Sequence, residues 1–277
     1  MVAKPAGPTS HDVVDIVRRA LGTDRVGHLG TLDPFAEGLL VVVVGRATRL
    51  TTFASGWRKA YEGVIRLGTV TATDDRTGSV VRQSEAWRTL GRDRIEAALQ
   101  TFRGSITQRP PAHSAVHVDG ERAYRRARRG EAVTLAARPV EIDQLELEAF
   151  TPPDLRFRAT VGGGTYLRSL ARDVGEALEC GAHLAELKRT AVGPFRLEEA
   201  RRPEDVTVGD LRAAGVLVRD LPARALGGEE RDAVVHGRPL PAVGEDARVA
   251  LFAADGELVA VGEREGEWLR PRVVVAE

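Results

Sequence analysis

The chain has 277 residues, of which 43% are hydrophobic and 29% are charged, with 40 basic and 40 acidic side chains. This composition excludes a disordered chain and a collagen-like repeat, and the length suits one large domain or two unequal ones. The single cysteine, Cys180, excludes an intramolecular disulfide and a cysteine-based metal cluster. The longest strongly apolar run, Leu39 to Val44, is too short to cross a bilayer, and the N-terminus lacks the apolar core of a signal peptide. We therefore expect a cytoplasmic protein that does not contact a membrane.

The first helix is predicted by both a start signal and a stop signal. Thr9 and Asp12 resemble a capping box, apolar residues follow at helical spacing, and Gly22 is a natural stop, so we expect a helix over 10–21. The run 39–44 is typical of a strand buried on both faces. Further along, the spacing predicts strands at 61–67 and 155–161, a helix at 94–102 and a helix after the glycines at 162–164. Strands and helices intermix without a regular βαβ rhythm, which favours an α+β fold.

The last part of the chain has a different pattern. We expect a break between Pro203 and Pro222, and beyond it glycine turns separate three strand-like segments, at 247–253, 258–262 and 273–276. The chain is therefore divided into a domain at 1–220 and a small β-rich module at 221–277. Within the first domain an irregular arm begins at 108, and its stretch 122–129 has five arginines in eight residues. Such a stretch suits contact with phosphates or forms a solvated face.

No motif indicates a cofactor, a metal or a covalent nucleophile. Leu167 stands where a dinucleotide fingerprint needs its third glycine, and the Gly-Lys-Ser/Thr of a Walker loop occurs nowhere. The six histidines include no HExxH pair, and His113 and His117 lie in a proline-rich segment without an acidic third ligand. Cys180 ends a predicted helix, and no Gly-x-Ser-x-Gly elbow is found. We expect neither a cofactor nor a metal.

Asp33 is the exception among the acidic residues. It lies in a glycine-flanked loop directly before the buried strand, where Pro34 biases its backbone toward an extended conformation and Gly30 permits a close approach to a ligand. A carboxylate in such a loop either makes a turn hydrogen bond or takes part in catalysis, and the loop alone leaves both roles open.

A family resemblance is carried by the segment around this aspartate. The catalytic loop of the TruB family of bacterial tRNA pseudouridine-55 synthases is similar to the run Gly27-His28-Leu29-Gly30-Thr31-Leu32-Asp33-Pro34-Phe35-Ala36-Glu37-Gly38-Leu39-Leu40. Further segments resemble that family in the family's own order: Lys4 to Ser10, Lys59 to Gly68 with Asp74-Asp75, Gln108 to Gly130, Gly164 to Leu170 and Gly181 to Thr190. The resemblance covers residues 1 to about 200.

The resemblance implies both a fold and an activity. The fold is a pseudouridine synthase core on a mixed, mostly antiparallel sheet with flanking helices, a thumb-like RNA-binding insertion at about 108–140, and a PUA-like RNA-binding module at 221–277. The activity is the isomerisation of uridine to pseudouridine at position 55 in the T-loop of tRNA, with the target base flipped out of its stack. A C–N bond breaks and a C–C bond forms within one molecule, so the reaction requires no cofactor.

The resemblance also assigns roles at the site. Asp33 matches the catalytic carboxylate, which attacks C1′, adds to C6 or removes a proton from C2′, and Arg168 matches its cationic partner. Tyr61 matches the tyrosine that stacks on the target base, and it is also a candidate general base. The remaining matches bind substrate: Tyr166 and Leu187 wall the uracil pocket, His28 contacts the flipped nucleotide or fills its space, and Lys4 lies near the site.

Contacts with phosphates must supply the energy that extrudes a uridine from a folded loop. The candidates for the RNA backbone are Arg122, Arg125, Arg126, Arg128, Arg129, Lys188 and Arg189. The arm departs from the family pattern, because His113 and His117 stand where a tyrosine and a lysine are usual. The expected partner is the T-arm stem-loop of tRNA, bound by a monomer without an obligate protein partner.

Two alternatives remain open at this point. One is a tRNA-binding folding chaperone whose catalysis is incidental or lost, although the presence of Asp33, Tyr61 and Arg168 together argues against loss. The other keeps the chemistry and changes the RNA, as a guide-dependent synthase acting on ribosomal RNA. The long insertion at 108–140 favours a stand-alone tRNA enzyme.

Overall fold

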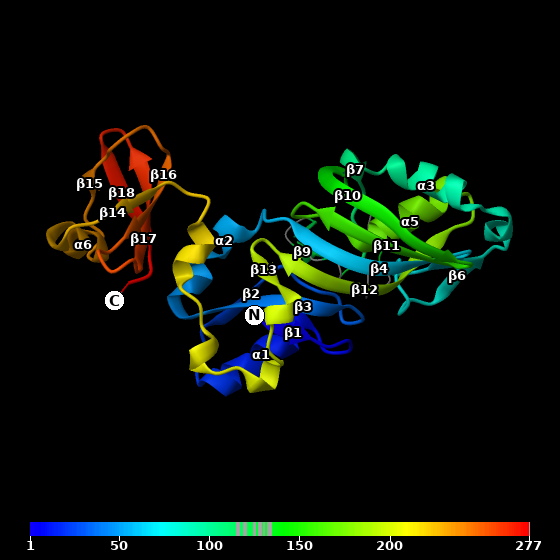
Figure 1. Ribbon diagram of the computed structural model, residues 1–277, viewed down its shortest axis with the longest axis horizontal. Coiled ribbons are helices and arrows are strands. Elements are labelled where there is room, and N and C mark those ends of the chain that lie inside the picture. The colour runs from blue at the N-terminus through cyan, green and yellow to red at the C-terminus, as the bar shows by residue number, and fades with distance from the viewer. Residues whose placement is uncertain are drawn as a thin grey trace.

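The protein is described by a computed structural model that covers residues 1–114, 117–118, 121–123, 126, 129, 131 and 135–276, with the backbone alone at 117, 118 and 122. Figure 1 shows a large sheet with its helices and a smaller sheet at the opposite end of the molecule. None of the described helices is both long and apolar enough to cross a membrane.

The large sheet forms the body of the first domain. Within the described residues it has nine strands: β1 (Val2–Lys4), β2 (Val26–Leu29), β3 (Glu37–Val44), β4 (Lys59–Leu67), β7 (Gly104–Gln108), β10 (Arg138–Thr151), β11 (Asp154–Val161), β12 (Ala182–Val192) and β13 (Phe195–Arg196). Its order is β1-β3-β12-β4-β11-β10-β7, with β2 on β3 and β13 on β12. The pairing of β12 with β3 is parallel and the others recorded for this sheet are antiparallel. The expected α+β fold on a mixed, mostly antiparallel sheet is therefore confirmed.

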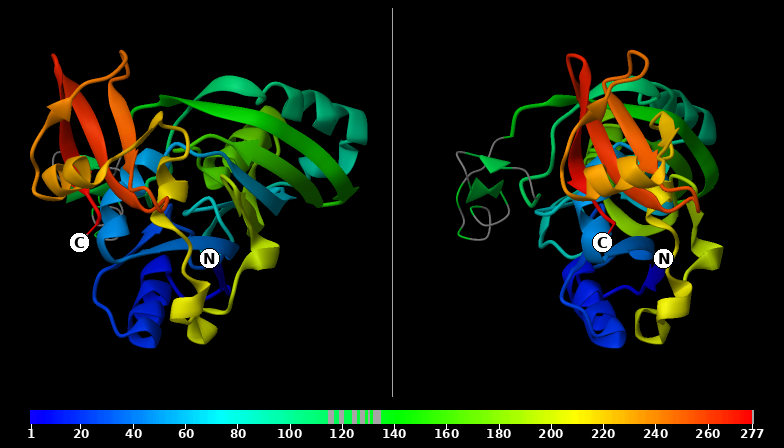
Figure 2. Two further views of the ribbon diagram at one scale, coloured as in Figure 1. Left: turned by 60° about the vertical axis from the view of Figure 1, so that its left-hand side comes forward. Right: turned by 90° about the vertical axis from the view of Figure 1, so that its left-hand side faces the viewer.

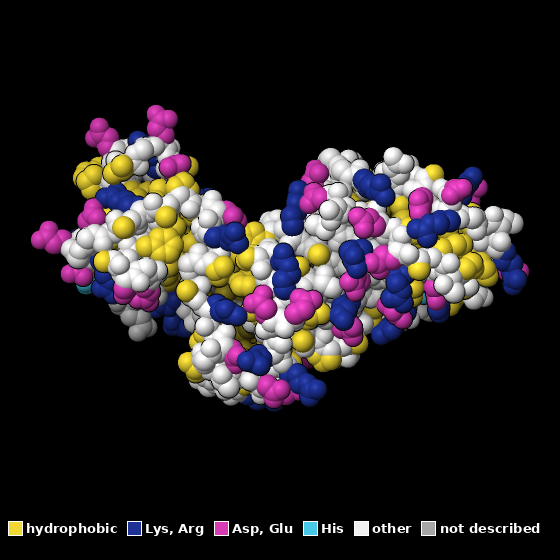
Figure 3. All heavy atoms as spheres, viewed as in Figure 1, with side chains coloured by type: hydrophobic (Ala, Val, Ile, Leu, Met, Phe, Trp, Pro, Cys, Tyr) yellow, Lys and Arg dark blue, Asp and Glu magenta, His cyan; other side chains and the backbone are white. Residues whose placement is uncertain are grey.

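One face of this sheet is covered by helices α3 (Arg92–Gln100) and α5 (Leu167–Ala177). Their apolar residues pack with the strands in one buried cluster, which includes Ile95 and Leu99 of α3, Leu170 and Val174 of α5, and Phe157 of β11. Because side chains alternate along a strand, the neighbouring residues point to the other face. Figure 3 shows basic and acidic side chains intermixed over the side of the molecule seen in Figure 1.

Strand β3 is buried on both faces, as its apolar run predicts. Leu39, Val41 and Val43 join a cluster that reaches into the C-terminal module, whereas Leu40 packs with the first helix, α1 (Ser10–Leu21). This helix has the predicted bounds and the predicted capping box at Thr9. The loop that carries Asp33 leads directly into β3, so its second end is anchored in the core.

The C-terminal module is a five-stranded sheet with one helix, α6 (Gly228–Val235), in the described chain. Its order is β14-β16-β17-β18-β15, made of β14 (Ala223–Ala225), β15 (Leu240–Pro241), β16 (Arg248–Phe252), β17 (Leu258–Glu265) and β18 (Trp268–Val274). The predicted last strand, at 273–276, begins earlier than expected because polar residues and Pro271 interrupt its pattern. The module docks through apolar contacts and through Arg49, whose Nη1 donates to the carbonyl of Val274 at 3.1 Å.

Two long strands, β10 and β12, were not predicted from periodicity. Strand β10 alternates glutamates with apolar residues and contains register shifts, which weaken a period-two signal. Between β7 and β10 lies the insertion at 108–140, whose described part includes the hairpin β8 (His117–Val118) with β9 (Glu121–Arg122). This hairpin stands away from the sheet (Figure 2), and we refer to the insertion as the arm.

Candidate active site

The loop that carries Asp33 is held in place by the chain's N-terminal segment. The Oγ of Ser10 donates to the carbonyl of Leu32 at 3.0 Å and accepts from its N–H at 2.8 Å. The N–H of Gly7 donates to the carbonyl of Pro34 at 2.7 Å. Within the loop, the N–H of Ala36 donates to the carbonyl of Asp33 at 3.1 Å. The backbone on both sides of Asp33 is therefore fixed before any ligand arrives.

Lys4 lies under this loop and not on the surface. Lys4 is 1% exposed. Its Nζ donates to the carbonyls of Ala36 at 2.7 Å, Pro5 at 3.0 Å and Pro34 at 3.3 Å. Burial lowers the pKa of Lys4 to about 8, while the nearby charge of Asp33 acts in the opposite direction.

Arg189 is also fully buried and grips the other end of the loop. Its Nε donates to the carbonyl of Leu39 at 2.8 Å, and its two terminal nitrogens donate to Gly30 at 3.0 Å and Thr31 at 3.4 Å. Lys4 and Arg189, expected at the substrate and at the RNA backbone, thus lie beneath the loop with their donors turned to backbone carbonyls. Their charges satisfy backbone carbonyls inside the protein, an arrangement that depends on contacts remote in sequence.

The site centres on a two-point pair between Asp33 and Arg168. Arg168 Nε donates to Oδ2 at 2.8 Å, and Nη2 donates to Oδ1 at 3.0 Å. The arginine side chain is 5% exposed, whereas that of Asp33 is 32% exposed, so the carboxylate remains open to a ligand. Further bonds run from Nη2 to the carbonyl of His113 at 2.9 Å and from Nη1 to that of Thr73 at 3.3 Å. This planar fork fixes the orientation of the carboxylate.

The environment of Asp33 changes its protonation equilibrium. Burial raises the pKa of Asp33 above its ordinary value, and Arg168 opposes this through its charge and its hydrogen bonds. Asp75 adds a second negative charge that raises the pKa, and Lys4 lowers it. Arg168 is thus the main group that favours the ionised carboxylate.

Asp75 is a buried carboxylate beside this pair that the sequence interpretation did not assign to the site. Its Oδ2 lies 3.8 Å from Arg168 Nε, and its Oδ1 accepts from the hydroxyl of Thr73 at 2.7 Å and from the N–H of Thr77 at 2.9 Å. The doubled aspartate of the Asp74-Asp75 motif was the available signal. Asp74, its neighbour, pairs with Arg172 at 3.1 Å.

Tyr61 and Leu187 lie together next to the loop. Both are nearly buried, at 6% and 7% exposure, and both belong to the core cluster that contains Leu32 and Phe35, which flank Asp33 on either side. An aromatic ring and an apolar side chain thus belong to the same buried cluster as two residues of the loop that carries Asp33. Such surroundings exclude water and suit a flat, partly apolar group such as a base.

The other two predicted binding residues are both half-buried. Tyr166 is half-buried directly before α5, with the guanidinium of Arg138 5.4 Å from its ring centroid. His28 is half-buried on β2, and its Nδ1 has no hydrogen-bond partner among the described residues. Burial, together with the charge of Arg189, lowers the pKa of His28. Because Nδ1 of this histidine is itself buried, it is not open to solvent in this structure.

The predicted RNA-contacting arginines lie on the arm, and the structure describes part of them. Arg129 forms ion pairs with Glu121 and Glu131 at 2.7 Å, and Arg126 pairs with Glu131 at 2.9 Å. Arg125 and Arg128 lie outside the described residues, and Arg122 is described by its backbone alone. The carbonyl of His113, at the root of the arm, is bonded to Arg168, which joins the arm to the pair of Arg168 with Asp33.

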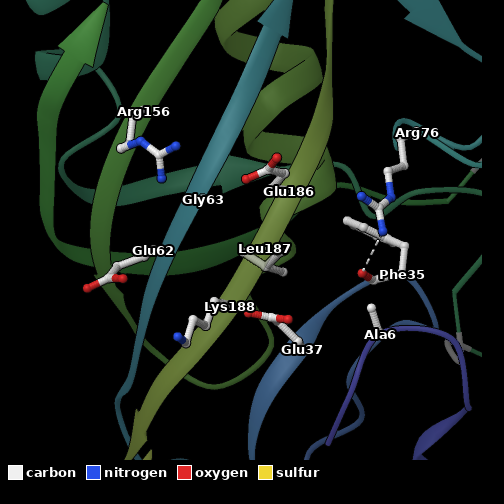
Figure 4. A pocket seen from close by; sticks show the side chains of 10 residues that line it. All are labelled: Ala6, Phe35, Glu37, Glu62, Gly63, Arg76, Arg156, Glu186, Leu187 and Lys188. Carbon is white, nitrogen blue, oxygen red and sulfur yellow. Dashed lines mark hydrogen bonds between the residues drawn. The ribbon is translucent and has the colours of Figure 1, made fainter.

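Lys188 lies on the other face of the sheet. It is exposed and stands in register with Glu37 on β3 and Glu62 on β4, so it alternates with Leu187, which faces the core. These side chains line a cavity of about 460 Å³, whose lining Figure 4 shows: Ala6, Phe35, Glu37, Glu62, Gly63, Arg76, Arg156, Glu186, Leu187 and Lys188. Two of these residues, Phe35 and Leu187, also belong to the cluster that contains Tyr61, so the cavity that Lys188 lines reaches the edge of that cluster.

Comparison with family models covers nearly the whole chain. A model described as TruB family pseudouridylate synthase (N terminal domain) matches residues 18–167. A second, described as tRNA pseudouridylate synthase B C-terminal domain, matches residues 168–226. A third, described as tRNA pseudouridine synthase II, C terminal, matches residues 221–276.

Curated relatives agree over their full length. The chain is 44% identical to a protein named tRNA pseudouridine synthase B from Thermobifida fusca (strain YX), with 100% of this chain and 97% of the relative covered. It is 43% identical to a protein of the same name from Mycobacterium tuberculosis (strain ATCC 25618 / H37Rv), with 99% and 94% covered.

Solved structures agree in fold at lower identity. A crystal structure of a Cbf5-Nop10-Gar1 complex contains a chain that is 27% identical, with a TM-score of 0.75 and 99% of this chain and 84% of that chain covered. A structure of an H/ACA RNP bound to a substrate RNA containing 2′-deoxyuridine matches at 25% identity with a TM-score of 0.74, covering 100% and 84%. On the match of the family models and the full-length relatives, the chain belongs to the TruB family of pseudouridylate synthases.

Proposed function

We propose that this protein converts uridine to pseudouridine at position 55 in the T-loop of tRNA. The observation that carries the proposal is the two-point pair of Asp33 with Arg168, placed beside Tyr61 and Leu187 in a chain 44% identical, end to end, to a tRNA pseudouridine synthase B. The pair supplies an oriented carboxylate, and the cluster supplies an apolar surface for a base.

The reaction is an isomerisation that balances within one nucleotide. The bond between C1′ and N1 breaks, the uracil turns, a bond between C1′ and C5 forms, and the proton on C5 is lost while N1 gains one. Asp33 is the group that acts on the nucleotide, and Arg168 keeps it ionised and oriented. We assign to Tyr61 the stacking on the detached base and a part in proton transfer at C5.

Access to the base requires that it leave the stack of the T-loop, at a cost of a few kcal/mol. We assign the compensating phosphate contacts to the arm, whose root is joined to the site by the bond from Arg168 to the carbonyl of His113. The C-terminal module, residues 221–277, is proposed to bind RNA outside the loop. Lys4 and Arg189 are not part of this contact surface, because they are buried under the loop.

The two alternatives differ in what they predict. Sequence identity to the curated tRNA enzymes is 43–44% over the full length, against 25–27% to chains of H/ACA and Cbf5 complexes, which favours a tRNA enzyme over a guide-dependent one.

We also propose that the enzyme works as a monomer, without an obligate protein partner, in the cytoplasm, because one chain supplies Asp33, Tyr61 and Arg168. Sedimentation equilibrium at working concentration tests the monomer.

The first experiment is single-turnover release of tritium from tRNA labelled with [5-³H]uridine. Wild type is compared with Asp33→Asn, and tRNA binding is measured in parallel. We expect release by wild type and none by the variant, although the variant still binds tRNA. A transcript with cytidine at position 55 is the substrate control, and it should release no tritium from that site.

Each outcome separates the candidates. Tight binding by both proteins without release by either would favour the chaperone. Release from ribosomal RNA fragments that requires an added guide RNA, with none from tRNA, would favour the guide-dependent enzyme.

A further inference from the structure

The side-chain amide of Gln108 forms a reciprocal clamp on the backbone of Tyr166. Its Nε2 donates to the carbonyl of Tyr166 at 3.2 Å, and its Oε1 accepts from the N–H of Tyr166 at 2.9 Å. Gln108 is 1% exposed, although a glutamine is ordinarily a surface residue. A buried amide is stable only when its donors and acceptors have partners, and here both sides of the amide are used on one residue.

The clamped residue is the entry to α5. Tyr166 is the N-cap of this helix, with an extended backbone, and its own side chain makes no capping hydrogen bond. The first turn of a helix has unpaired N–H groups that otherwise require a side-chain cap. Gln108, from the end of β7, therefore holds the start of α5 from outside the helix.

Arg168 is the second residue of that helix. Its guanidinium meets four acceptor groups from three different segments: both oxygens of Asp33 and the carbonyls of Thr73 and His113. Such a fork tolerates little displacement, because all the bonds depend on where the first turn of α5 begins. Gln108 itself makes none of these bonds.

We propose that Gln108 is a positioning residue for the isomerisation, which acts by fixing the start of α5 so that Arg168 meets both oxygens of Asp33. This inference rests on the proposed function for its kinetic consequence, but its structural consequence concerns the carboxylate alone. Gln108 also stands where the arm begins, and the next residue, Arg109, accepts at its carbonyl from Ser169 at 2.8 Å and from Arg172 at 2.9 Å. The root of the arm and the first two turns of α5 are thus one connected unit.

The competing explanation is that Gln108 merely closes the root of the arm. A closing role predicts weaker tRNA binding or lower stability, with the carboxylate unchanged. A positioning role predicts a change at Asp33, since Arg168 is the main group that lowers its pKa. The other charged groups that face Asp33 are Asp75 and Lys4, and neither contacts Gln108 through any bond described above.

The test uses Gln108→Met, which keeps the length of the side chain and removes both hydrogen bonds. The pKa of Asp33 is measured by ¹³C NMR titration of aspartate carboxyls in the full chain, with its signal assigned from Asp33→Asn. We expect the pKa to rise by about half a unit or more relative to wild type. In single-turnover assays we expect the rate to fall about 10- to 100-fold, with the tRNA dissociation constant changed less than about threefold.

The matched control is Gln144→Met, the same substitution on the neighbouring strand β10, where Gln144 accepts from the hydroxyl of Thr160 at 3.1 Å far from the pair. It should leave both the pKa and the rate unchanged. If Gln108→Met does not fold, Gln108→Asn keeps an amide of shorter reach and should show the same direction of change.

An unchanged pKa of Asp33 in a folded Gln108 variant would overturn the inference, whatever happens to binding. A wild-type protein that releases no tritium would overturn the proposed function instead. The NMR titration would still decide the role of Gln108, because it does not depend on turnover.

Discussion

Arg168 donates to both carboxylate oxygens of Asp33 and, with the same Nη2, to the carbonyl of His113. One guanidinium therefore links the loop before β3 with the root of the arm. The pair has the geometry in which arginine and lysine differ most, because a lysine ammonium cannot present two parallel donors.

Replacing Arg168 by lysine should therefore preserve the charge and lose the orientation. We expect Arg168→Lys to lower the single-turnover rate about 100-fold or more, with tRNA binding nearly unchanged. Arg172→Lys is the matched control, since Arg172 lies on the same helix as Arg168 but pairs with Asp74 and Asp173. Equal losses in the two variants would contradict a specific role for the fork.

The pH dependence should follow the ionisation of Asp33. Burial raises the pKa of Asp33, and Arg168 lowers it. Because the proposed reaction uses the ionised carboxylate, the rate should increase as pH rises through this pKa and then level off. In Arg168→Lys the inflection should move to higher pH. The measurement is the single-turnover rate over a pH series that starts at about 4, the ordinary pKa of a carboxyl, and ends at about 8. An inflection at lower pH in the variant would show that Arg168 does not favour the charged form.

The buried Lys4 should make the free energy of unfolding depend on pH above neutrality. Its pKa is about 8 in the folded protein against an ordinary value of 10.5, so the unfolded chain holds this proton more tightly. Below about pH 8 the lysine is charged in both states, and the unfavourable effect of its burial is present in full. Between about pH 8 and 10.5 the folded state loses the proton first, and the free energy of unfolding rises.

Lys4→Met should remove that rise, which we expect to be about 2 kcal/mol. It should also lower stability at neutral pH, because three carbonyls under the loop lose their donor. Denaturant unfolding at pH 7 and pH 10 measures both effects. Lys59→Met is the comparison: because the pKa of Lys59 is also lowered to about 8, this variant should lose a similar rise, whereas the carbonyls that lose a donor, those of Ser55 and Trp57, lie outside the loop.

Replacing Gly38 by alanine should lower the free energy of unfolding far more than the same change at Gly45, although both glycines have a positive φ. A Cβ at Gly38, where φ is +109°, would lie 2.3 Å from the carbonyl oxygen of Arg189, which is backbone and cannot move aside. We expect Gly38→Ala to cost about 4 kcal/mol or more in unfolding free energy. Gly45→Ala, with φ +66° and open space around it, should cost about 1 kcal/mol. Similar melting temperatures for the two variants would argue against the close pairing of β3 with β12.

The arm should contribute to the salt dependence of binding. Arg129→Ala should reduce the slope of log K against log salt by about one if this side chain contacts one phosphate. Arg66→Ala serves as the control, because Arg66 is paired with Asp154 on the sheet. The same slope in wild type and Arg129→Ala would remove this residue from the contact surface.

The sequence predicted those features that depend on local pattern. The helix at 10–21 followed from its capping box, and the double burial of 39–44 followed from an unbroken apolar run. The pairing of Asp33 with Arg168 came from the family resemblance, since 135 residues separate them and no periodicity connects them. The environments of Lys4, Arg189 and Gln108 depend on carbonyl groups brought together by folding, so a charged or polar residue that looks exposed in the sequence proves to be interior.

Strand β3 is shared by two apolar clusters, one with α1 and one with the C-terminal module, and the loop of Asp33 enters it directly. The two ends of the molecule are consequently connected through the segment that follows the reactive carboxylate. Amide protons of β3 should be among the slowest to exchange with solvent in the whole chain. Loosening the module by removing the bond from Arg49 to the carbonyl of Val274 should quicken that exchange, and with it the local opening of the loop of Asp33, which lies in the other domain.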